Sequence, residues 1–259
     1  MLFKYLATIQ LYSSIIMLLF WLLQLKTKDA SLVDVIWALS IFISTIYLFL
    51  SLSHYNLRHL IIALLSSFWS LRLAGYLLLR IKKSTQEDSR YQQMRQSLEQ
   101  FAPIGFFFFY QAQAMFVTIF TTPIAIALMS PRKALNFIDI IGIAVFILAI
   151  VGESIADKQL MQFKMQNKGA NKTCNKGLWY YSRHPNYFFE WVHWFAYVFF
   201  SYQSSYFWLS CLAPLVMLFF LWKVTGISHV EREALKKKPD YKEYIKTTSA
   251  FIPWFKKKN

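Results

Sequence analysis

The segment GLWYYSRHPNYFFEW, residues 177–191, opens an aromatic and apolar run that continues to residue 203. Proline is favoured at the first position of a helix, so we predict that a helix begins at Pro185. Asn186 and Glu190 lie four residues apart and would share one face of that helix, directed at a single ligand. Ionisable groups at membrane depth are costly and usually face a polar cavity. The segment therefore predicts a functional site within a membrane-embedded helical fold.

Similar apolar runs recur along most of the 259 residues, of which 56% are hydrophobic and 19% aromatic. Each run is close to the roughly 20 residues that a membrane-spanning helix needs. We therefore predict an all-α, polytopic integral membrane protein with about seven transmembrane helices in one bundle. The first run lacks a small-residue cleavage site and is interpreted as a retained helix. The expected spans are 5–25, 32–53, 59–80, 104–129, 136–155, 187–203 and 206–225.

Basic charge is concentrated in two polar segments. Residues 156–186 carry six basic residues against one acidic residue, and residues 223–259 carry ten against four, out of a formal net charge of +15. The positive-inside rule predicts that both segments, and with them the C-terminus, are cytoplasmic. These segments would also attract anionic lipid headgroups. No recognition motif accompanies them, so nucleic-acid binding is not expected.

We expect a single domain over residues 1–259, organised in two parts. Residues 1–155 hold five predicted crossings on the substrate side, and residues 156–259 hold cofactor-binding loops, two crossings and the basic tail. Cys174 and Cys211 are predicted in a loop and in a span respectively, so a disulfide is not expected. No pairing of cysteine with histidine indicates a metal site.

The first part contains a few polar side chains within or beside its spans. Asp34 lies at the start of the second span, whereas Arg72, Tyr76 and Arg80 follow one stripe of the third. Arg72 is deep enough in the span to need a partner, which Asp34 or Glu190 could supply. A structural ion pair and a ligand-binding role both satisfy such a buried charge, and both interpretations stay open.

The sequence lacks the motifs of soluble nucleotide-binding and hydrolytic enzymes: G-x-G-x-x-G, G-x-x-x-x-G-K-[ST], H-E-x-x-H and G-x-S-x-G. Catalysis would therefore use a site built between membrane helices. Such a site suits a lipophilic substrate from the bilayer, and the basic segments suit an anionic, phosphate-bearing cofactor. A non-enzymatic lipid-binding or transport protein is the competing class, although the broken helices in matching halves that are typical of transporters are missing from the sequence.

Four segments resemble the steroid 5α-reductase superfamily, and more closely its bacterial, DUF1295-type branch of membrane reductases. They are SLVDVIWALSIF (31–42), WSLRLAGYLLLRIKKSTQEDSRY (69–91), SRHPNYFFEW (182–191) and PDYKEYIKTTSAFIPWF (239–255). The resemblance implies a seven-helix enzyme of the bacterial inner membrane that binds NADPH and reduces a conjugated carbon–carbon double bond of a lipophilic enone. In that chemistry a proton donor polarises the carbonyl while hydride is transferred.

The resemblance also implies a set of cofactor-binding residues. Asn186 and Glu190 match a cofactor-holding pair, and Asp157 with Lys164 resembles an acid followed seven residues later by a basic residue. Arg183 and His184 would face the phosphates of the cofactor; flanking charges outside the membrane are the alternative interpretation. The remaining implied contacts are Glu153, Asn171, Lys172, Tyr187 and Arg232.

The implied catalytic residues depart from the family pattern. Trp69 stands where the steroid enzymes carry the tyrosine that polarises the carbonyl, and tryptophan cannot donate a proton in the same way. Asp34 could replace the missing acid, and Tyr76 or Tyr91 could replace the missing phenol. Arg72 belongs to the same set of candidate catalytic residues. Reduction of some lipid-soluble enone, rather than of a steroid specifically, is the resulting expectation.

A second enzyme class remains open from the sequence. Membrane methyltransferases that act on isoprenylcysteine or phospholipid amines have a similar R-H-P motif, followed by a tail like residues 229–244. In that case Arg183 and His184 would bind the carboxylate of S-adenosylmethionine. The spacing of Asn186 and Glu190 favours the reductase.

Overall fold

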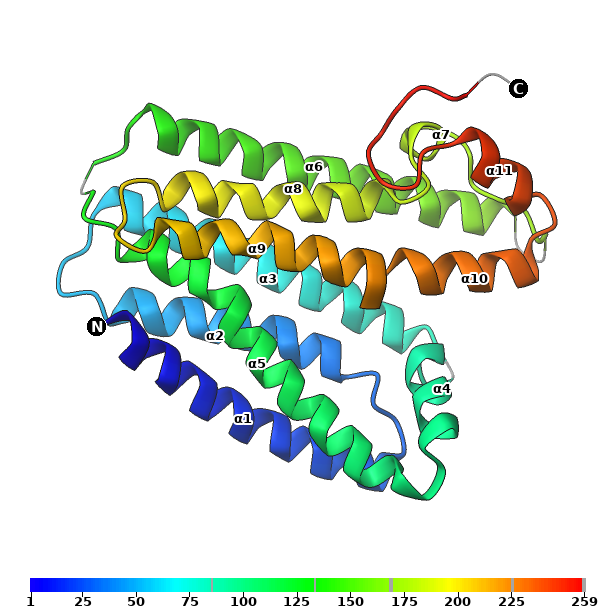
Figure 1. Cartoon of the computed structure of the whole chain (residues 1–259), viewed down its shortest axis with the longest axis horizontal. Helices are drawn as coiled ribbons and strands as arrows, with labels where there is room; N and C mark the ends of the chain where they lie inside the picture. The colour runs from blue at the N-terminus through cyan, green and yellow to red at the C-terminus, as the bar shows by residue number, and fades with distance from the viewer. Residues whose placement is uncertain (85, 133, 168–169, 225, 258–259) are drawn as a thin grey trace. The chain divides into compact units, whose positions relative to one another are not determined.

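The computed structural model describes residues 1–84, 86–132, 134–167, 170–224 and 226–257, and its elements over these residues are helices (Figure 1). The chain divides into two compact units. Unit 1 comprises residues 1–135 and 201–210, and unit 2 comprises residues 136–200 and 211–259. The division after residue 155 between the two expected parts of the single domain lies inside a continuous helix, α6 (Phe137–Gln166), because the polar residues after that point extend the helix instead of ending it.

Six helical segments over the described residues are long and apolar enough to cross a membrane. They confirm the prediction of an all-α integral membrane protein, but the predicted number of seven is not confirmed. The segment expected to cross at residues 187–203 is α8 (Pro185–Phe200), which has 16 residues. At about 1.5 Å per residue this helix is shorter than the roughly 30 Å hydrocarbon layer.

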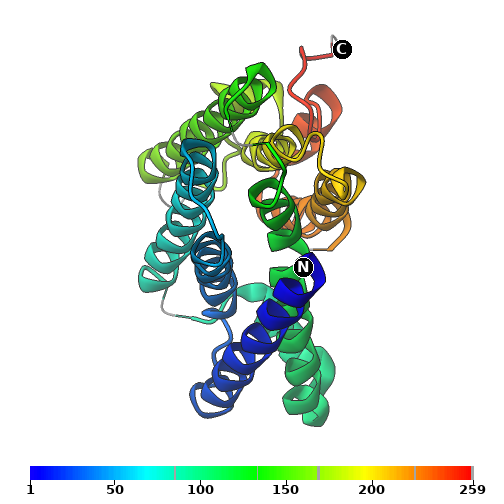
Figure 2. The same cartoon turned by 90° about the vertical axis from the view of Figure 1, so that its left-hand side faces the viewer.

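Unit 1 contains four long helices and a short polar one. These are α1 (Leu2–Thr27), α2 (Val33–Leu50), α3 (Leu57–Lys82), α4 (Ser89–Leu98) and α5 (Ala102–Leu128), with a turn of 3₁₀ helix, η1 (Glu99–Phe101), before α5. Helix α1 packs against α5, and α2 packs against both α3 and α5 (Figure 2). The polar segment before α5 therefore includes a helix that the sequence interpretation treated only as a connection.

An aromatic contact joins α2, α3 and α5 within unit 1. The ring of Trp37 lies 6.3 Å from that of Trp69 and 5.6 Å from that of Phe120, both edge to face. Trp69 is fully buried. The position where the resemblance placed a missing tyrosine is thus part of the packed core, since edge-to-face aromatic pairs stabilise such contacts.

Unit 2 is built on the pair α6 and α8, which pack along each other. Its other helices are α7 (Leu178–Tyr181), α9 (Phe207–Phe219, which begins in unit 1), the π-helix η2 (Phe220–Val224), α10 (Ile227–Lys237) and α11 (Tyr241–Thr247). Two glycines of α6 allow its close approach to α8. A Cβ on Gly142 would lie 2.7 Å from the ring of Phe200, and one on Gly152 would lie 2.4 Å from the ring of Phe189.

The ends of the two helices follow from local sequence. Pro185 begins α8, as predicted, because its fixed φ suits the first helical turn. Asn136 caps α6 by accepting hydrogen bonds from the backbone of Ile138 and Asp139, at 3.0 and 3.1 Å. The Asp139 carboxylate accepts in return from the backbone N–H of Asn136, which completes a capping box.

Candidate functional site

A polar face lies between α6 and α8 in an otherwise apolar pair. It consists of Glu153 and Asp157 on α6 and Asn186 and Glu190 on α8. The Asn186 side-chain amide donates to the Asp157 carboxylate at 3.1 Å, and the Glu190 carboxylate accepts from the indole of Trp194 at 3.2 Å. Because each helix contributes two residues four apart, the polar face follows from helical spacing.

One atom of this polar face has an unused hydrogen-bonding capacity. The side-chain oxygen Oδ1 of Asn186 is buried and has no hydrogen-bond partner among the described residues. A buried acceptor without a donor costs about 1–3 kcal/mol, so native proteins rarely leave one unless a ligand or water supplies the donor. The polar face is therefore suited to a ligand that presents an N–H or O–H group beside carboxylates.

A second group of polar residues, the Arg183 cluster, lies directly before α8 and consists of Arg183, His184 and Glu231. Arg183 Nε donates to Glu231 Oε1 at 2.7 Å, and a terminal nitrogen donates to Oε2 at 3.2 Å. The other terminal nitrogen donates to the carbonyls of Ile245 and Thr248, at 3.0 and 2.6 Å. These four bonds use most of the five N–H donors of the guanidinium.

His184 contacts the same carboxylate. Its Nε2 lies 3.1 Å from Glu231 Oε1, and its ring stacks on that of Tyr187 at a centroid distance of 5.4 Å. Burial lowers the pKa of His184, and the nearby Glu231 carboxylate only partly opposes this effect. The imidazole is therefore neutral at pH 7, which suits a packed structural position better than electrostatic attraction of phosphate.

The C-terminal segment holds the Arg183 cluster in place. The hydroxyl of Tyr244 donates to the carbonyl oxygens of Trp179 and Ser182. The Asp240 carboxylate accepts from the backbone and the hydroxyl of Thr173, at 2.8 and 2.7 Å. These bonds connect α11 to the loop before α7 and to the start of α8.

The remaining predicted cofactor contacts of unit 2 lie on its surface. Lys164 is exposed near the end of α6, and Asn171 and Lys172 are exposed in the following loop. Arg232 is also exposed, and its Nε donates back to the carbonyl of Ser228 on its own helix at 3.1 Å. The cationic side chains of Lys164, Lys172 and Arg232 are thus exposed, whereas that of Arg183 is buried.

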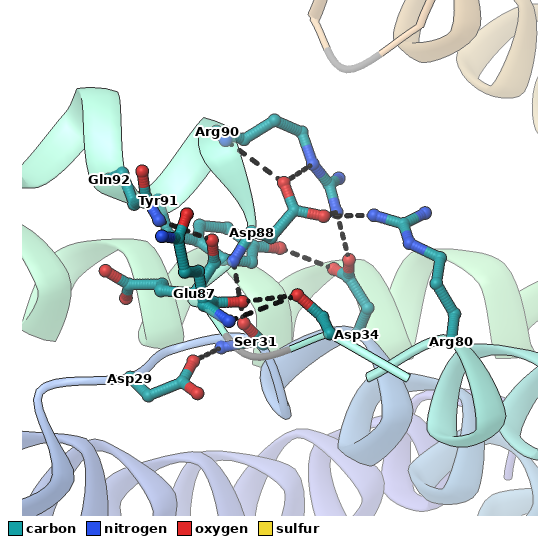
Figure 3. A network of polar contacts seen from close by, with 11 residues as sticks. Asp29, Ser31, Asp34, Arg80, Glu87, Asp88, Arg90, Tyr91 and Gln92 are labelled. Atoms are coloured by element: carbon teal, nitrogen blue, oxygen red, sulfur yellow. Dashed lines mark hydrogen bonds and ion pairs between the residues drawn. The ribbon is translucent and has the colours of Figure 1, made fainter. Parts of the chain in front are cut away.

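Unit 1 contains a third polar group, the Asp34 cluster of Asp34, Arg80, Asp88, Arg90 and Tyr91 (Figure 3). The Tyr91 hydroxyl donates to Asp34 Oδ1 at 2.8 Å, and a terminal nitrogen of Arg90 donates to Oδ2 at 2.7 Å. Tyr91 is buried on α4, whereas Asp34 is partly exposed at the start of α2. The carboxylate of Asp34 thus holds the buried phenol of Tyr91 in position, although the two residues are 57 apart in the sequence.

Asp88 joins the two arginines of this cluster. It accepts from Arg90 Nε at 2.9 Å and forms an ion pair with Arg80, and its side chain also caps α4. Burial alone would raise the pKa of Asp88, but the hydrogen bonds and charge of Arg90, with the charge of Arg80, lower the pKa to about 2. Asp88 is therefore ionised at pH 7, and Arg80 does not simply extend towards solvent.

The structure brings together some of the predicted catalytic residues and separates others. Asp34 and Tyr91 are hydrogen-bonded, as an acid and a phenol that act together would be. Asp34, one of the two partners considered for Arg72 from the sequence, is bound by Arg90. Arg72 and Tyr76 lie on α3, where the Tyr76 side chain is exposed.

Two charged residues that organise these clusters were not predicted as site residues. Arg90 lies beside Tyr91 in one of the segments that carried the resemblance, and its adjacency to a candidate phenol is a signal that could have found it. Glu231 is one of four acidic residues in the strongly basic tail. An acidic residue in such a context indicates a partner for a buried cation.

No curated protein and no solved structure matches the chain. The model of the family described as "Protein of unknown function (DUF1295)" matches residues 20–248, which include the polar face, the Arg183 cluster and the Asp34 cluster. The chain belongs to the DUF1295 family.

Proposed function

We propose that the protein is a membrane oxidoreductase that binds NADPH at the polar face of α6 and α8 and reduces a conjugated carbon–carbon double bond of a lipophilic enone. The observation that carries this proposal is the buried Oδ1 of Asn186, which has no hydrogen-bond partner among the described residues. A nicotinamide carboxamide presents N–H donors that would satisfy this oxygen. The hydroxyls of a ribose would in turn donate to carboxylates such as Glu190 and Asp157.

The distribution of charge supports an anionic cofactor. The polar face carries acceptors, which suit carboxamide and hydroxyl groups, whereas the exposed Lys164 and Lys172 suit phosphates. Arg183 contributes indirectly, because its guanidinium is already bound to Glu231 and to two carbonyls and thereby positions the start of α8. NADPH, when bound, supplies the hydride.

The proton that completes the reduction is assigned to Tyr91, with Asp34 as the residue that orients it. A phenol can polarise a carbonyl by hydrogen bonding and stabilise the enolate that develops as hydride adds to the β-carbon. For this the single O–H of Tyr91 would turn from Asp34 to the substrate, its proton would end on the α-carbon of the enolate, and water would restore the phenol. Arg90 holds the Asp34 carboxylate in place through a hydrogen bond of 2.7 Å. Tyr76, which is exposed on α3, is the other candidate donor.

The methyltransferase alternative is less well supported. It requires Arg183 and His184 to bind the carboxylate of S-adenosylmethionine, but both side chains already bind Glu231. A cofactor carboxylate would have to displace Glu231 and leave that carboxylate partly buried without its partners, which costs several kcal/mol. Cofactor binding on the cytoplasmic side belongs to the same proposal and is supported by the positive-inside rule.

The test is oxidation of NADPH by detergent-purified protein in the presence of a panel of lipid-soluble enones and their saturated analogues. We expect NADPH to be consumed with the enones only, and one saturated product to form for each NADPH oxidised. Glu190→Gln should raise the KM for NADPH at least about tenfold, which corresponds to the loss of one hydrogen bond to the cofactor. The matched variant Glu243→Gln, on the surface of α11, should behave as wild type. Absence of product with every enone, despite NADPH binding, would contradict the proposed reaction.

A further inference from the structure

The C-terminal tail passes α7 (Figure 1), and the side chains at that place are mainly aromatic and basic. This tail surface consists of Tyr180, Tyr181, Trp254, Phe255, Lys256 and Lys257. Trp254 and Phe255 are 68% and 75% exposed, although both are large and apolar. Contiguous apolar side chains at a protein surface mark an interaction site more often than single ones do.

The backbone holds these side chains outward. The Trp254 amide donates to the carbonyl of Tyr181 at 2.9 Å, and the Lys257 amide donates to that of Thr247 at 3.0 Å. Between these bonds and the Arg183 cluster, Phe251 is buried and anchors the tail. The outward orientation of Trp254 and Phe255 is therefore a property of the fold.

Phe251 marks the inner side of the same segment. Its ring lies 5.5 Å from that of Trp191, 5.9 Å from that of Phe188 and 6.0 Å from that of Trp222. The tail thus places one aromatic residue in the core of unit 2 and, three residues later, presents two more at the surface. Burial of an aromatic ring is favourable, yet only Phe251 of these three rings is buried.

The members of the tail surface contact one another. The ring of Phe255 lies 6.2 Å from that of Trp254 and 6.3 Å from that of Tyr181, and Tyr181 lies 5.1 Å from Tyr180. Lys256 Nζ lies 4.3 Å from the centroid of the Tyr180 ring. Aromatic rings and ammonium groups therefore form one continuous surface.

Charge and position identify what binds there. The sequence contains no acidic residue between Lys246 and Lys257, or between Lys158 and Glu190, the segment that includes α7. Tryptophan, tyrosine and lysine gather at the membrane–water interface, and lysines there are attracted to anionic headgroups. We propose that the tail surface binds the anionic headgroup layer of the membrane, with the rings at the boundary of the acyl chains and the lysines on lipid phosphates. This inference does not depend on the proposed reductase activity.

The test measures the depth of position 254 in the bilayer. Trp254→Cys, in a Cys174→Ser, Cys211→Ser background, is labelled with an environment-sensitive fluorophore and reconstituted into vesicles of phosphatidylcholine with or without phosphatidylglycerol. Lys246→Cys is the matched control, since its side chain is 71% exposed on α11 and lies outside the tail surface. We expect a blue-shifted emission and severalfold protection from aqueous iodide at position 254, greater with phosphatidylglycerol. Lys256→Ser with Lys257→Ser should remove most of the dependence on phosphatidylglycerol.

Two results would overturn the inference. One is equal iodide accessibility of positions 254 and 246 in vesicles that contain phosphatidylglycerol. The other is protection of position 254 in detergent that rises with protein concentration and needs no lipid, which would assign the surface to a second copy of the chain. If the cysteine-free background does not fold, quenching by brominated phosphatidylglycerol is compared between the wild type and Trp254→Phe. In that case the inference expects measurably less total quenching in the variant, and equal quenching would overturn it.

Discussion

Arg183 and Asn186 are three residues apart at the start of α8, yet their side chains are in opposite states. The Arg183 guanidinium makes four hydrogen bonds to Glu231 and to two carbonyls. The Asn186 amide makes one bond to Asp157 and leaves its oxygen buried without a partner among the described residues. In this pair, the arginine that holds the fold is satisfied within the chain, whereas the asparagine that we propose binds a ligand keeps part of its hydrogen-bonding capacity unused.

The largest effect on stability is expected from removing the hydrogen bonds of Arg183. Arg183→Met removes the cation and leaves the Glu231 carboxylate and two carbonyls without their donor, so we expect a loss of about 3 to 5 kcal/mol in the free energy of unfolding. Arg232→Met is the matched control, because Arg232 is exposed beside Glu231. It should change stability by less than about 0.5 kcal/mol. Thermal unfolding in detergent measures both, and similar stabilities for the two variants would contradict the structural role of Arg183.

The second effect concerns the proton donor. Tyr91→Phe removes the hydroxyl that donates to Asp34, so enone reduction should slow about 100-fold, as for the loss of a general acid. Stability should fall by about 1 kcal/mol, the value of one hydrogen bond, and NADPH affinity should be unchanged. Tyr76→Phe provides the comparison. If that variant loses turnover and Tyr91→Phe keeps it, Tyr76 is the donor and the Asp34 cluster is structural.

The third effect tests whether the unpaired oxygen of Asn186 binds the cofactor. Asn186→Leu removes the buried oxygen together with the amide, so stability should change by no more than about 1 kcal/mol. The affinity for NADPH should nevertheless fall at least about tenfold, which corresponds to about 1.4 kcal/mol. Binding and unfolding are measured on the same preparations, with Asn175→Leu in the exposed loop as control. A strongly destabilised variant with unchanged affinity would place Asn186 among the structural residues.

The smallest effect is a pH dependence in the Asp34 cluster. Burial alone would raise the pKa of Asp88, but Arg90 and Arg80 lower it from 3.8 to about 2. The folded state therefore favours the ionised form, so this stability is present above pH 3.8 and is lost as the pH falls through about 2. Solvent screening limits the contribution to about 1 kcal/mol. Asp88→Asn should be less stable than wild type by that amount at pH 7 and equal to it near pH 2; a difference independent of pH would contradict this assignment.

Local features of the sequence predicted much of unit 2. The fixed φ of Pro185 correctly placed the start of α8, and helical spacing correctly put Asn186 and Glu190 on neighbouring turns. The hydropathy of residues 136–155 located α6 but not its end, because the helix continues through polar residues to Gln166 that hydropathy does not register. Hydropathy likewise placed the end of α8 too late, since the apolar run continues past Phe200, where the 16-residue helix ends.

Contacts between distant residues were beyond prediction from one sequence. Arg183 and Glu231 are 48 residues apart, and Asp34 and Tyr91 are 57 apart, so no local pattern connects them. Asp34 and Glu190 were both considered as partners of Arg72, which lies deep in its span, and the sequence did not indicate that α4 brings Arg90 to the Asp34 carboxylate. Tertiary packing, rather than spacing, decides which of several candidate charges become partners.

The central claim is that the polar face of α6 and α8 binds NADPH. The most direct measurement is the thermal shift of detergent-purified protein with NADPH, NADH or S-adenosylmethionine, on the wild type, Glu190→Ala and Arg232→Ala. We predict a shift with NADPH that disappears in Glu190→Ala and is reduced at most slightly in Arg232→Ala, whose side chain is an exposed surface contact. A shift with S-adenosylmethionine alone, or an NADPH shift of full size in Glu190→Ala, would contradict the account.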